Sequence, residues 1–328
     1  MKIAVVILNW NGKALLEQFL PSVVAYSAEA NIYVADNAST DDSVAFVKAN
    51  YPEVSIIQNT VNGGYAKGYN DALKDVNEDI LCLLNSDVEV TEGWLTPIIT
   101  AFETDSNLAI VQPKILDFVS KTKFEYAGAA GGFIDKYGYP FCRGRIFNTI
   151  EEDKNQYNNA EIFWASGACF FIRKDVFESL AGFDESFFAH MEEIDLCWRA
   201  FNIGLTSKYI SESKVYHVGG ATLPTNNPKK TYLNFRNSLF TLTKNASGFL
   251  PGLIFTRLVL DGIAGIHFLT KFQFANIIAI LRAHFGYYVA LSRLLKQRKA
   301  IQQQPDYYNV KSIVVQYFLK GKTEFNRL

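Results

Sequence analysis

Short apolar runs alternate with segments of helical spacing over the first hundred residues of the chain. The runs Ile3–Leu8, Ile32–Ala35, Val54–Ile57 and Ile80–Leu84 have the length of buried strands. Between them, apolar residues recur every three or four positions, which is typical of amphipathic helices. We expect these helices at Lys13–Tyr26, Asp42–Asn50 and Tyr65–Val76. Strands and helices alternating at this interval predict βαβ units and a parallel sheet.

The alternation loosens after about residue 106. One clear helical segment remains, His190–Asn202, together with a stretch rich in Gly and Tyr at 127–144. The expected strands here are Leu108–Gln112, Phe124–Ala127, Ile162–Trp164, Cys169–Ile172, Leu205–Ile210 and Val215–Val218. The whole pattern favours an α/β fold whose second half is less regular than its first.

The last hundred residues are expected to form helices, two of them long and apolar. These are Phe249–Thr270 and Gln273–Ser292. Charges inside the first argue against a bilayer span, because each central charge costs about 2.5–3.5 kcal/mol. On a helical wheel, four polar residues in and next to this segment share one face: Arg257, Asp261, His267 and Lys271. A polar stripe on an apolar helix suits a helix lying in a membrane interface.

Charge divides the chain into two parts, although the net charge is only −1. Residues 1–228 hold 17 Lys and Arg against 30 Asp and Glu, whereas residues 229–328 hold 15 against 3. A basic, apolar tail needs an anionic neighbour, and an anionic lipid surface would supply one. A helical subdomain or a homo-oligomer interface is the alternative. The near-zero total argues against nucleic acid as a partner.

Cysteine usage and the N-terminus indicate a cytoplasmic protein. Cys82, Cys142, Cys169 and Cys197 lie far apart without a C-x-x-C pair, so neither a zinc site nor a disulfide framework is expected. The first apolar run has six residues, which is short for a signal peptide.

Polar clusters follow three of the predicted strands. They are Asn9–Asn11, Asp36–Thr40 and Asn85–Asp87. The carboxyl ends of strands are the ligand-binding edge of an open α/β sheet. Asp87 could hold a divalent ion there through oxygen. Asn, Ser and Asp are also residues that favour turns, so the alternative is that Asn85–Asp87 simply form a turn.

Three further features could carry chemistry. The carboxylates of Glu192, Glu193 and Asp195 either complement the helix dipole or repel one another, which would raise a pKa toward that of a general base. His217 could be a structural imidazole or a metal ligand. The glycines of Asn62–Asn70 would let backbone approach a phosphate at a helix start.

Taken in order, these features resemble the family 2 glycosyltransferases with the GT-A fold, and most of all their bacterial rhamnosyltransferase-like branch. The resemblance spans most of residues 3–240. Its motifs are Val5–Gly12, Asp36–Asp41, Asn62–Tyr65, Leu83–Asp87, Ser166–Ala168, Gly182–Glu185, Glu192–Arg199 and His217–Gly220.

The resemblance implies a Rossmann-like nucleotide-binding mixed sheet flanked by helices. Residues 1–228 would form this catalytic domain, with a nucleotide-sugar half at about 1–105 and an acceptor half at about 106–228. Residues 229–328 would be a mostly helical C-terminal extension.

The resemblance also implies roles for single residues. Asp87 and His217 would hold Mg²⁺ or Mn²⁺ on the diphosphate, in a motif whose first Asp is replaced here by the neutral Asn85. Glu193 would be the catalytic base, with Glu192 as the second candidate. The donor would be bound by Asn9, Asn11, Asp36, Asn62, Gly64, Asn85, Ser86 and Arg236, and the acceptor by Trp164, Ser166 and Gly167. Lys67 is a further cationic candidate, or simply an exposed lysine.

The expected activity is inverting transfer of a sugar, rhamnose by likeness to the branch, from a nucleotide diphosphate sugar to a glycan or lipid-linked acceptor in cell-surface polysaccharide synthesis. The enzyme would be peripheral to the cytoplasmic face of the inner membrane. Two alternatives remain. One is a catalytically degenerate nucleotide-sugar-binding scaffold, which the neutral Asn85 favours. The other is a sugar nucleotidyltransferase, which would need a glycine-rich, basic loop after the first strand, where only Lys13 is basic.

Overall fold

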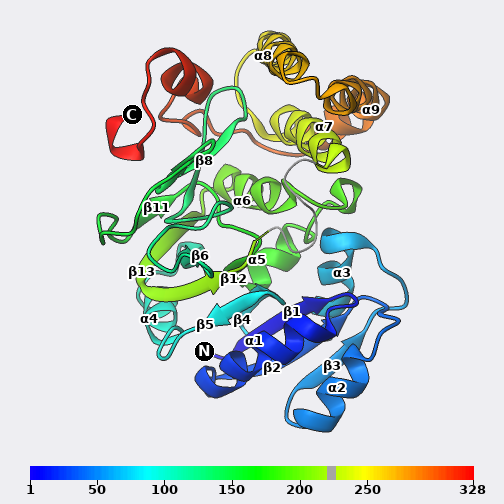
Figure 1. Ribbon diagram of the computed structural model, residues 1–328, viewed down its shortest axis with the longest axis vertical. Coiled ribbons are helices and arrows are strands. Elements are labelled where there is room, and N and C mark those ends of the chain that lie inside the picture. The colour runs from blue at the N-terminus through cyan, green and yellow to red at the C-terminus, as the bar shows by residue number, and fades with distance from the viewer. Residues whose placement is uncertain (220–226) are drawn as a thin grey trace.

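The computed structural model describes residues 1–219 and 227–328, and a nine-stranded mixed sheet runs through its centre (Figure 1). The strand order is β11-β13-β6-β12-β4-β1-β2-β3, with β5 beside β13. The strands are β1 (Ile3–Asn9), β2 (Ala30–Asp36), β3 (Ser55–Gln58), β4 (Ile80–Asn85), β5 (Val88–Val90), β6 (Leu108–Asp117), β11 (Ala160–Ile162), β12 (Cys169–Arg173) and β13 (Thr206–His217).

The first half of the sheet confirms the predicted βαβ arrangement. Strands β1 to β4 are parallel, and the two central ones, β1 and β4, are continuous apolar runs buried on both faces. The helices of this half are α1 (Lys13–Tyr26), α2 (Ser43–Asn50), α3 (Gly64–Ala72) and α4 (Thr96–Thr104). In the register, Asn9 lies beside Asp36 and Leu8 beside Asn85. The three polar clusters therefore meet at one sheet edge.

The second half departs from the prediction in several places. Strand β12 is antiparallel to both β4 and β6, which makes the sheet mixed. The expected strand Phe124–Ala127 is wrong, since only a single bridge joins Phe124 to Leu116. The two strands expected within 205–218 form one strand with a register shift between Ile210 and Lys214. Helices α5 (Lys174–Ser179) and α6 (Glu192–Asn202) belong to this half.

A small second sheet, which the sequence did not predict, begins in the stretch rich in Gly and Tyr and extends to Ile150. Its strands are β7 (Gly132–Ile134), β8 (Pro140–Cys142), β9 (Arg145–Ile146) and β10 (Thr149–Ile150). The end of the chain returns to this sheet, where the Phe325 ring lies 5.0 Å from that of Phe133 (Figure 1).

The C-terminal region contains α7 (Pro228–Asn245), α8 (Leu250–Thr270) and α9 (Phe274–Lys299). Phe240 of α7 and Tyr287 of α9 belong to the same hydrophobic cluster as the residues of the central sheet. The described part of this region therefore shares a core with the body (Figure 1).

Arg257 and Asp261, the two charged residues inside α8, face the body of the protein. The expectation that they lie on an exposed polar stripe is therefore wrong. Arg257 Nε lies 2.7 Å from Asp261 Oδ1, and both side chains are buried. Tyr139 donates to Asp261 at 2.8 Å, and His284 lies 3.2 Å from the same carboxylate. Only His267 and Lys271 of the stripe are exposed. The opposite, outward face of the helix is apolar.

Candidate active site

Polar side chains at the ends of β1 and β2 form a hydrogen-bonded group. Asn9 Nδ2 donates to Asp36 Oδ1 at 3.2 Å and to Ser39 Oγ at 3.2 Å. Asn11 Oδ1 accepts from the Thr40 N–H at 2.7 Å. Asn9 Oδ1 is buried without a partner among the described residues. The structure therefore brings together Asn9, Asn11 and Asp36, as the sequence predicted for a donor site.

The glycine-rich turn before α3 joins this edge to the second half of the protein. Asn62 Oδ1 accepts from the Gly64 N–H at 3.0 Å. Gly64 has φ +80°, and a Cβ there would lie 2.6 Å from the Phe188 carbonyl oxygen. The Tyr65 N–H donates to that same oxygen at 3.0 Å. Only glycine permits this close approach. Lys67 is engaged by Asp71 at 2.7 Å, which fits the exposed-lysine alternative.

A buried carboxylate–imidazole pair lies at the end of β4. Asp87 Oδ1 is 3.2 Å from His217 Nε2, although 130 positions separate the two residues along the chain. The pairing of β13 with β5 brings them together, because His217 lies beside Val88 in the register. Asn85 Nδ2 is 3.5 Å from the same imidazole nitrogen. Ser86 is half-buried between Asn85 and Asp87.

A second carboxylate, Glu125, contacts the other side of the imidazole, with its Oε1 3.4 Å from His217 Nδ1. Burial alone would lower the pKa of His217, but the adjacent carboxylates of Asp87 and Glu125 outweigh it and raise this pKa to about 10. Gly219 packs on Glu125, where a Cβ would lie 2.9 Å from Oε1. Gly220, the last residue of this motif, lies outside the described residues.

The pair fits a divalent cation. Carboxylate oxygen and imidazole nitrogen are donors that Mn²⁺ accepts, and Mg²⁺ is bound in proteins through one or two carboxylates together with substrate phosphates. Asp87 and His217 would hold the ion, and the imidazole would release its proton on binding. No third His, Cys, Asp or Glu completes a metal cluster in the described ranges, so further ligands would come from a substrate.

The two candidate bases open α6. Burial, and then the neighbouring Glu193 charge, raise the pKa of Glu192 well above its usual range. Burial also raises the pKa of Glu193, to about 7, although backbone N–H groups at the helix start favour its ionised form. In the described part of the chain, one oxygen of each carboxylate has no hydrogen-bond partner. Asp195 differs, because Lys244 (2.9 Å) and Arg199 (2.8 Å) neutralise it.

The loop before α6 holds an unfavourable backbone conformation. Phe188, His190 and Met191 have φ of 66°, 69° and 73°, in a region that side chains disfavour by about 1–3 kcal/mol each. Asn237 of α7 stabilises the loop, since its Nδ2 donates to the carbonyls of Phe187, Ala189 and His190 at 3.1, 2.9 and 2.8 Å. Helix α7 thereby positions the start of α6.

Arg236, predicted to contact the donor, serves this loop too. Its Nη2 donates to the carbonyls of Ser186 at 3.0 Å and Phe187 at 3.1 Å. These bonds orient the guanidinium toward the loop that leads into the candidate bases of α6. Its contact with a pyrophosphate stays a prediction.

The predicted acceptor residues line the turn before β12. Trp164 is 3 % exposed, and its indole N–H donates to the Phe133 carbonyl at 2.8 Å. The Ser166 N–H donates to Gln112 Oε1 at 2.8 Å. The Gly167 carbonyl accepts from the Tyr65 hydroxyl at 2.8 Å. Trp164 is therefore buried, whereas Gly167 is partly exposed.

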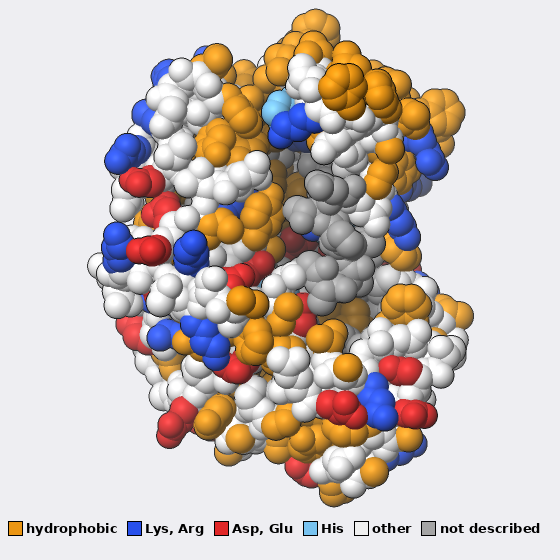
Figure 2. All heavy atoms as spheres, viewed as in Figure 1, with side chains coloured by type: hydrophobic (Ala, Val, Ile, Leu, Met, Phe, Trp, Pro, Cys, Tyr) orange, Lys and Arg blue, Asp and Glu red, His pale blue; other side chains and the backbone are white. Residues whose placement is uncertain are grey.

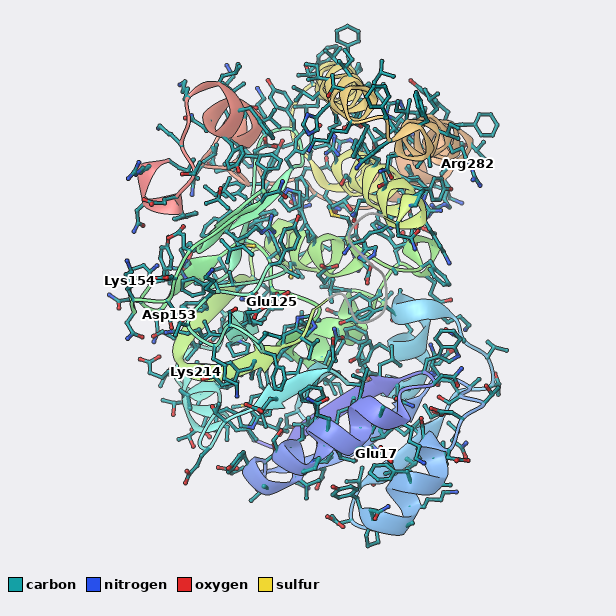
Figure 3. All side chains as sticks on the ribbon, in the orientation of Figure 1. Glu17, Glu125, Asp153, Lys154, Lys214 and Arg282 are labelled. Carbon is teal, nitrogen blue, oxygen red and sulfur yellow. The ribbon has the colours of Figure 1, made fainter. Side chains whose placement is uncertain are left out.

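The carboxylate–imidazole pair and the candidate bases lie in one region. Hydrogen bonds link the two: the Asn85 N–H donates to the Ala168 carbonyl at 2.9 Å, and the neighbouring Gly167 carbonyl accepts from the Tyr65 hydroxyl at 2.8 Å. The Tyr65 N–H in turn donates to the Phe188 carbonyl, in the loop before α6. Tyr65 likewise lies close enough to Glu192 and Glu193 for their charges to act on it. Figure 3 shows Glu125 near the middle of the molecule, and Figure 2 shows acidic side chains gathered at the centre of the same face.

Sequence reasoning missed Glu125 and Asn237. Glu125 lies in a segment that was interpreted as a strand, and no local pattern links it to His217. Asn237 carried a weak signal, because it is a polar residue within a helix that buries Leu233, Leu239 and Phe240. A polar side chain at such a position needs hydrogen-bond partners, which here are the loop carbonyls.

Comparison with known sequences supports the same interpretation. Residues 4–181 match the profile "Glycosyl transferase family 2". The chain belongs to this family. It is 25 % identical over 218 residues to the N-acetylglucosaminyl-diphospho-decaprenol L-rhamnosyltransferase of Mycobacterium tuberculosis, a match that covers 62 % of this chain and 71 % of that one. This family 2 glycosyltransferase is therefore related to a transferase that, by its name, acts on a lipid-linked acceptor.

Solved structures confirm the GT-A-like fold. GalNAc-T7 with UDP, GalNAc and Mn²⁺ superimposes with a TM-score of 0.57 at 16 % identity, over 75 % of this chain and 48 % of that one. The mannosyltransferase PcManGT from Pyrobaculum calidifontis, in complex with GDP-Man and Mn²⁺, gives 0.53 at 14 % identity, over 89 % and 75 %. At these identities the likeness concerns the fold alone.

Proposed function

We propose that this family 2 glycosyltransferase is an inverting enzyme, with Glu193 as its catalytic base and Asp87 and His217 as its metal ligands. The proposal rests on one observation: two groups of residues that suit this reaction lie in one region of the protein. One is the buried pair with a 3.2 Å contact between Asp87 and His217. The other is Glu193, whose pKa of about 7 suits proton transfer at neutral pH.

The reaction then follows from these groups. The acceptor oxygen forms a bond to the sugar C1 from the face opposite the diphosphate, while the C1–phosphate bond breaks and its electron pair leaves with the diphosphate. Glu193 takes the hydroxyl proton as the attack proceeds. A divalent ion held by Asp87 and His217 would supply positive charge beside the leaving group. A single displacement of this kind inverts the configuration at C1.

For the substrates, the relative from M. tuberculosis supports a rhamnosyl donor and a lipid-linked acceptor in glycan synthesis. The donor half provides the buried group of Asn9 and Asp36 for the nucleotide. Asn85 in place of an acidic residue favours a weaker metal site. This is also the feature that would suit a scaffold without turnover.

We further propose that the outer face of α8 and α9 lies in the membrane interface. Both helices are long and apolar, with mean hydropathy of 1.5 and 1.3, and only 17 % and 28 % of those stretches are buried. Figure 2 shows hydrophobic side chains covering this end of the molecule. The largest exposed ones include Phe255, Ile263, Ile266, Phe272, Ile278, Leu281, Phe285 and Val289. Because Arg257 and Asp261 are tied to the body, an interfacial position fits better than a bilayer span.

Thermal-shift measurements with UDP-, GDP- and dTDP-sugars, with and without Mn²⁺, test the donor and the metal together. We expect one nucleotide class to raise Tm, and to raise it more with Mn²⁺. Product analysis with the stabilising donor and a polyprenyl-diphosphate-linked sugar then tests transfer and inversion. Binding without any transfer would indicate the scaffold, and no stabilisation by any of the three classes would overturn the proposal.

Flotation with anionic liposomes tests the membrane face. The variant Phe255→Gln/Phe285→Gln should float at least tenfold less, because each buried phenylalanine contributes about 1.5–3 kcal/mol. The control Val119→Gln/Ile203→Gln removes two exposed apolar side chains outside α8 and α9 and should float like the parent. Equal flotation of both variants would contradict the assignment.

A further inference from the structure

A groove of about 540 Å³ lies between α7 and α9, beside the loop that precedes α6. Its lining combines cationic, aromatic and apolar side chains, among them Lys229, Arg236, Arg282, Tyr232, Phe188 and Ile278. Arg282 is labelled on the outer side of α9 in Figure 3. The groove is separate from the Asp87–His217 pair.

The three cations of the groove share no counter-ion. Arg236 and Arg282 both lie over the Tyr232 ring, at 5.2 and 5.7 Å from its centre, and Lys229 lies over Phe188 at 5.0 Å. None forms an ion pair with a carboxylate of the described residues. Like charges held close together repel one another, so a bound anion with more than one negative charge would be strongly favoured. A diphosphate has that charge.

The groove continues into the apolar outer face of α9. Ile278 lines the groove and is 57 % exposed, and Leu281 and Phe285 extend the same face at 63 % and 72 % exposure. A ligand that joins an anionic head to a long apolar chain matches both surfaces at once. A soluble nucleotide or free phosphate would match only the first.

The groove also borders the segment that carries the candidate base. Arg236 donates to the carbonyls of Ser186 and Phe187, only a few residues before Glu193. The next residue, Phe188, lines the groove, and its carbonyl accepts from the Tyr65 N–H at the start of α3. A sugar attached to an anion in the groove would therefore extend toward the catalytic region.

We propose that this groove binds the diphosphate of a polyprenyl-diphosphate-linked acceptor, with the isoprenoid chain lying along the outer face of α9. The inference deepens the proposed function and rests on it, since it assigns the acceptor's lipid and diphosphate to a site. Lys229 and Arg282 contact the diphosphate. Arg236 holds the loop and completes the positive charge.

The test uses the full-length protein and farnesyl diphosphate as a short probe, with affinity measured by titration calorimetry. The variant Lys229→Gln/Arg282→Gln should bind it at least tenfold more weakly, because charge-assisted hydrogen bonds to the diphosphate are lost. The control Lys48→Gln/Lys154→Gln removes the same charge from exposed positions outside the groove and should bind like the parent. Arg236 is left intact because its loss would release the loop.

Farnesol and inorganic pyrophosphate form the remaining arms, and each should bind at least tenfold more weakly than farnesyl diphosphate. Equal affinity of the groove variant and the parent would overturn the proposal. So would pyrophosphate binding as tightly as farnesyl diphosphate, or displacement of the probe by UDP, which would make the groove a donor site. These readouts need no transfer, so they stay distinct from the donor thermal shift that tests the proposed function.

In turnover, the groove variant should raise KM for a polyprenyl-diphosphate-linked sugar at least tenfold with kcat nearly unchanged. A fall in kcat with KM unchanged would instead mean that the groove acts only through the loop before α6, and would refute the assignment.

Discussion

Replacing Glu193 by glutamine keeps the size of the side chain but removes the proton acceptor. The general base contributes about 10²–10⁴ to the rate, so kcat should fall by that factor, which is about 3–5 kcal/mol in the activation barrier. Donor affinity should change little, because Glu193 lies on α6 and most of the predicted donor residues lie at the ends of β1, β2 and β4. A coupled assay of nucleotide diphosphate release measures kcat, and the thermal shift with donor checks binding.

The pH dependence of the parent enzyme gives an independent check. With a pKa of about 7, Glu193 is half ionised at pH 7 and only about one tenth ionised at pH 6. The value of kcat/KM should therefore fall about fivefold from pH 7 to pH 6 and about tenfold for each pH unit below that, and the glutamine variant should not show this fall.

The control variant is Glu178→Gln, an exposed carboxylate on α5, which should leave kcat unchanged. If Glu193→Gln kept full turnover while Glu192→Gln lost it, the base would be Glu192. Full turnover in both variants would refute the use of either carboxylate as a base.

Three further predictions concern stability and metal binding. Glu192→Gln should raise the free energy of unfolding, and the gain should grow above pH 4.5 by up to about 1.4 kcal/mol per pH unit, because the folded parent keeps a proton that its unfolded chain releases. Urea unfolding of both proteins at pH 4, 6 and 8 measures this gain. A gain that is the same at all three pH values would contradict the raised pKa of Glu192. Asn85→Asp should lower the Mn²⁺ concentration for half-maximal activity about tenfold by adding a charged ligand beside His217, and an unchanged value would argue against a metal there. Asp261→Asn should lower the free energy of unfolding by about 3–5 kcal/mol, because it leaves Arg257 buried without its counter-charge. The control Asp42→Asn changes a side chain that is 82 % exposed and should lower it by less than about 0.5 kcal/mol in the same urea unfolding.

The donor half was predictable because its signals are local. A buried parallel strand is a continuous apolar run, and the polar residues that follow it must lie at one sheet edge. The strands around Ile3–Asn9 and Ile80–Asn85 therefore appear nearly where the sequence predicts them. Helix α6 is also close to the prediction, with Glu192 and Glu193 at its first turn.

The rest depended on contacts that a local pattern cannot show. His217 meets Asp87 only because β13 pairs with β5, and Glu125 reaches the imidazole from a segment without regular structure. The strands of the small sheet have two or three residues, which is too short for a periodic signal. The helical wheel found the polar face of α8 but could not tell whether it faced water or protein. The spacing of Arg257 and Asp261, four positions apart with opposite charge, also fits a buried ion pair.

Helix α7 joins the C-terminal region to the loop before α6, although the composition of this region differs strongly from that of the body. Its Asn237 stabilises the strained loop before α6. Its Lys244, 2 % exposed, neutralises both Asp184 at 2.8 Å and Asp195 at 2.9 Å. Lys244 therefore supplies the counter-charge that these two buried carboxylates need. The basic tail therefore supports the first turns of α6 directly: Lys244 balances the charge of Asp195, and Asn237 holds the loop that leads into Glu192 and Glu193.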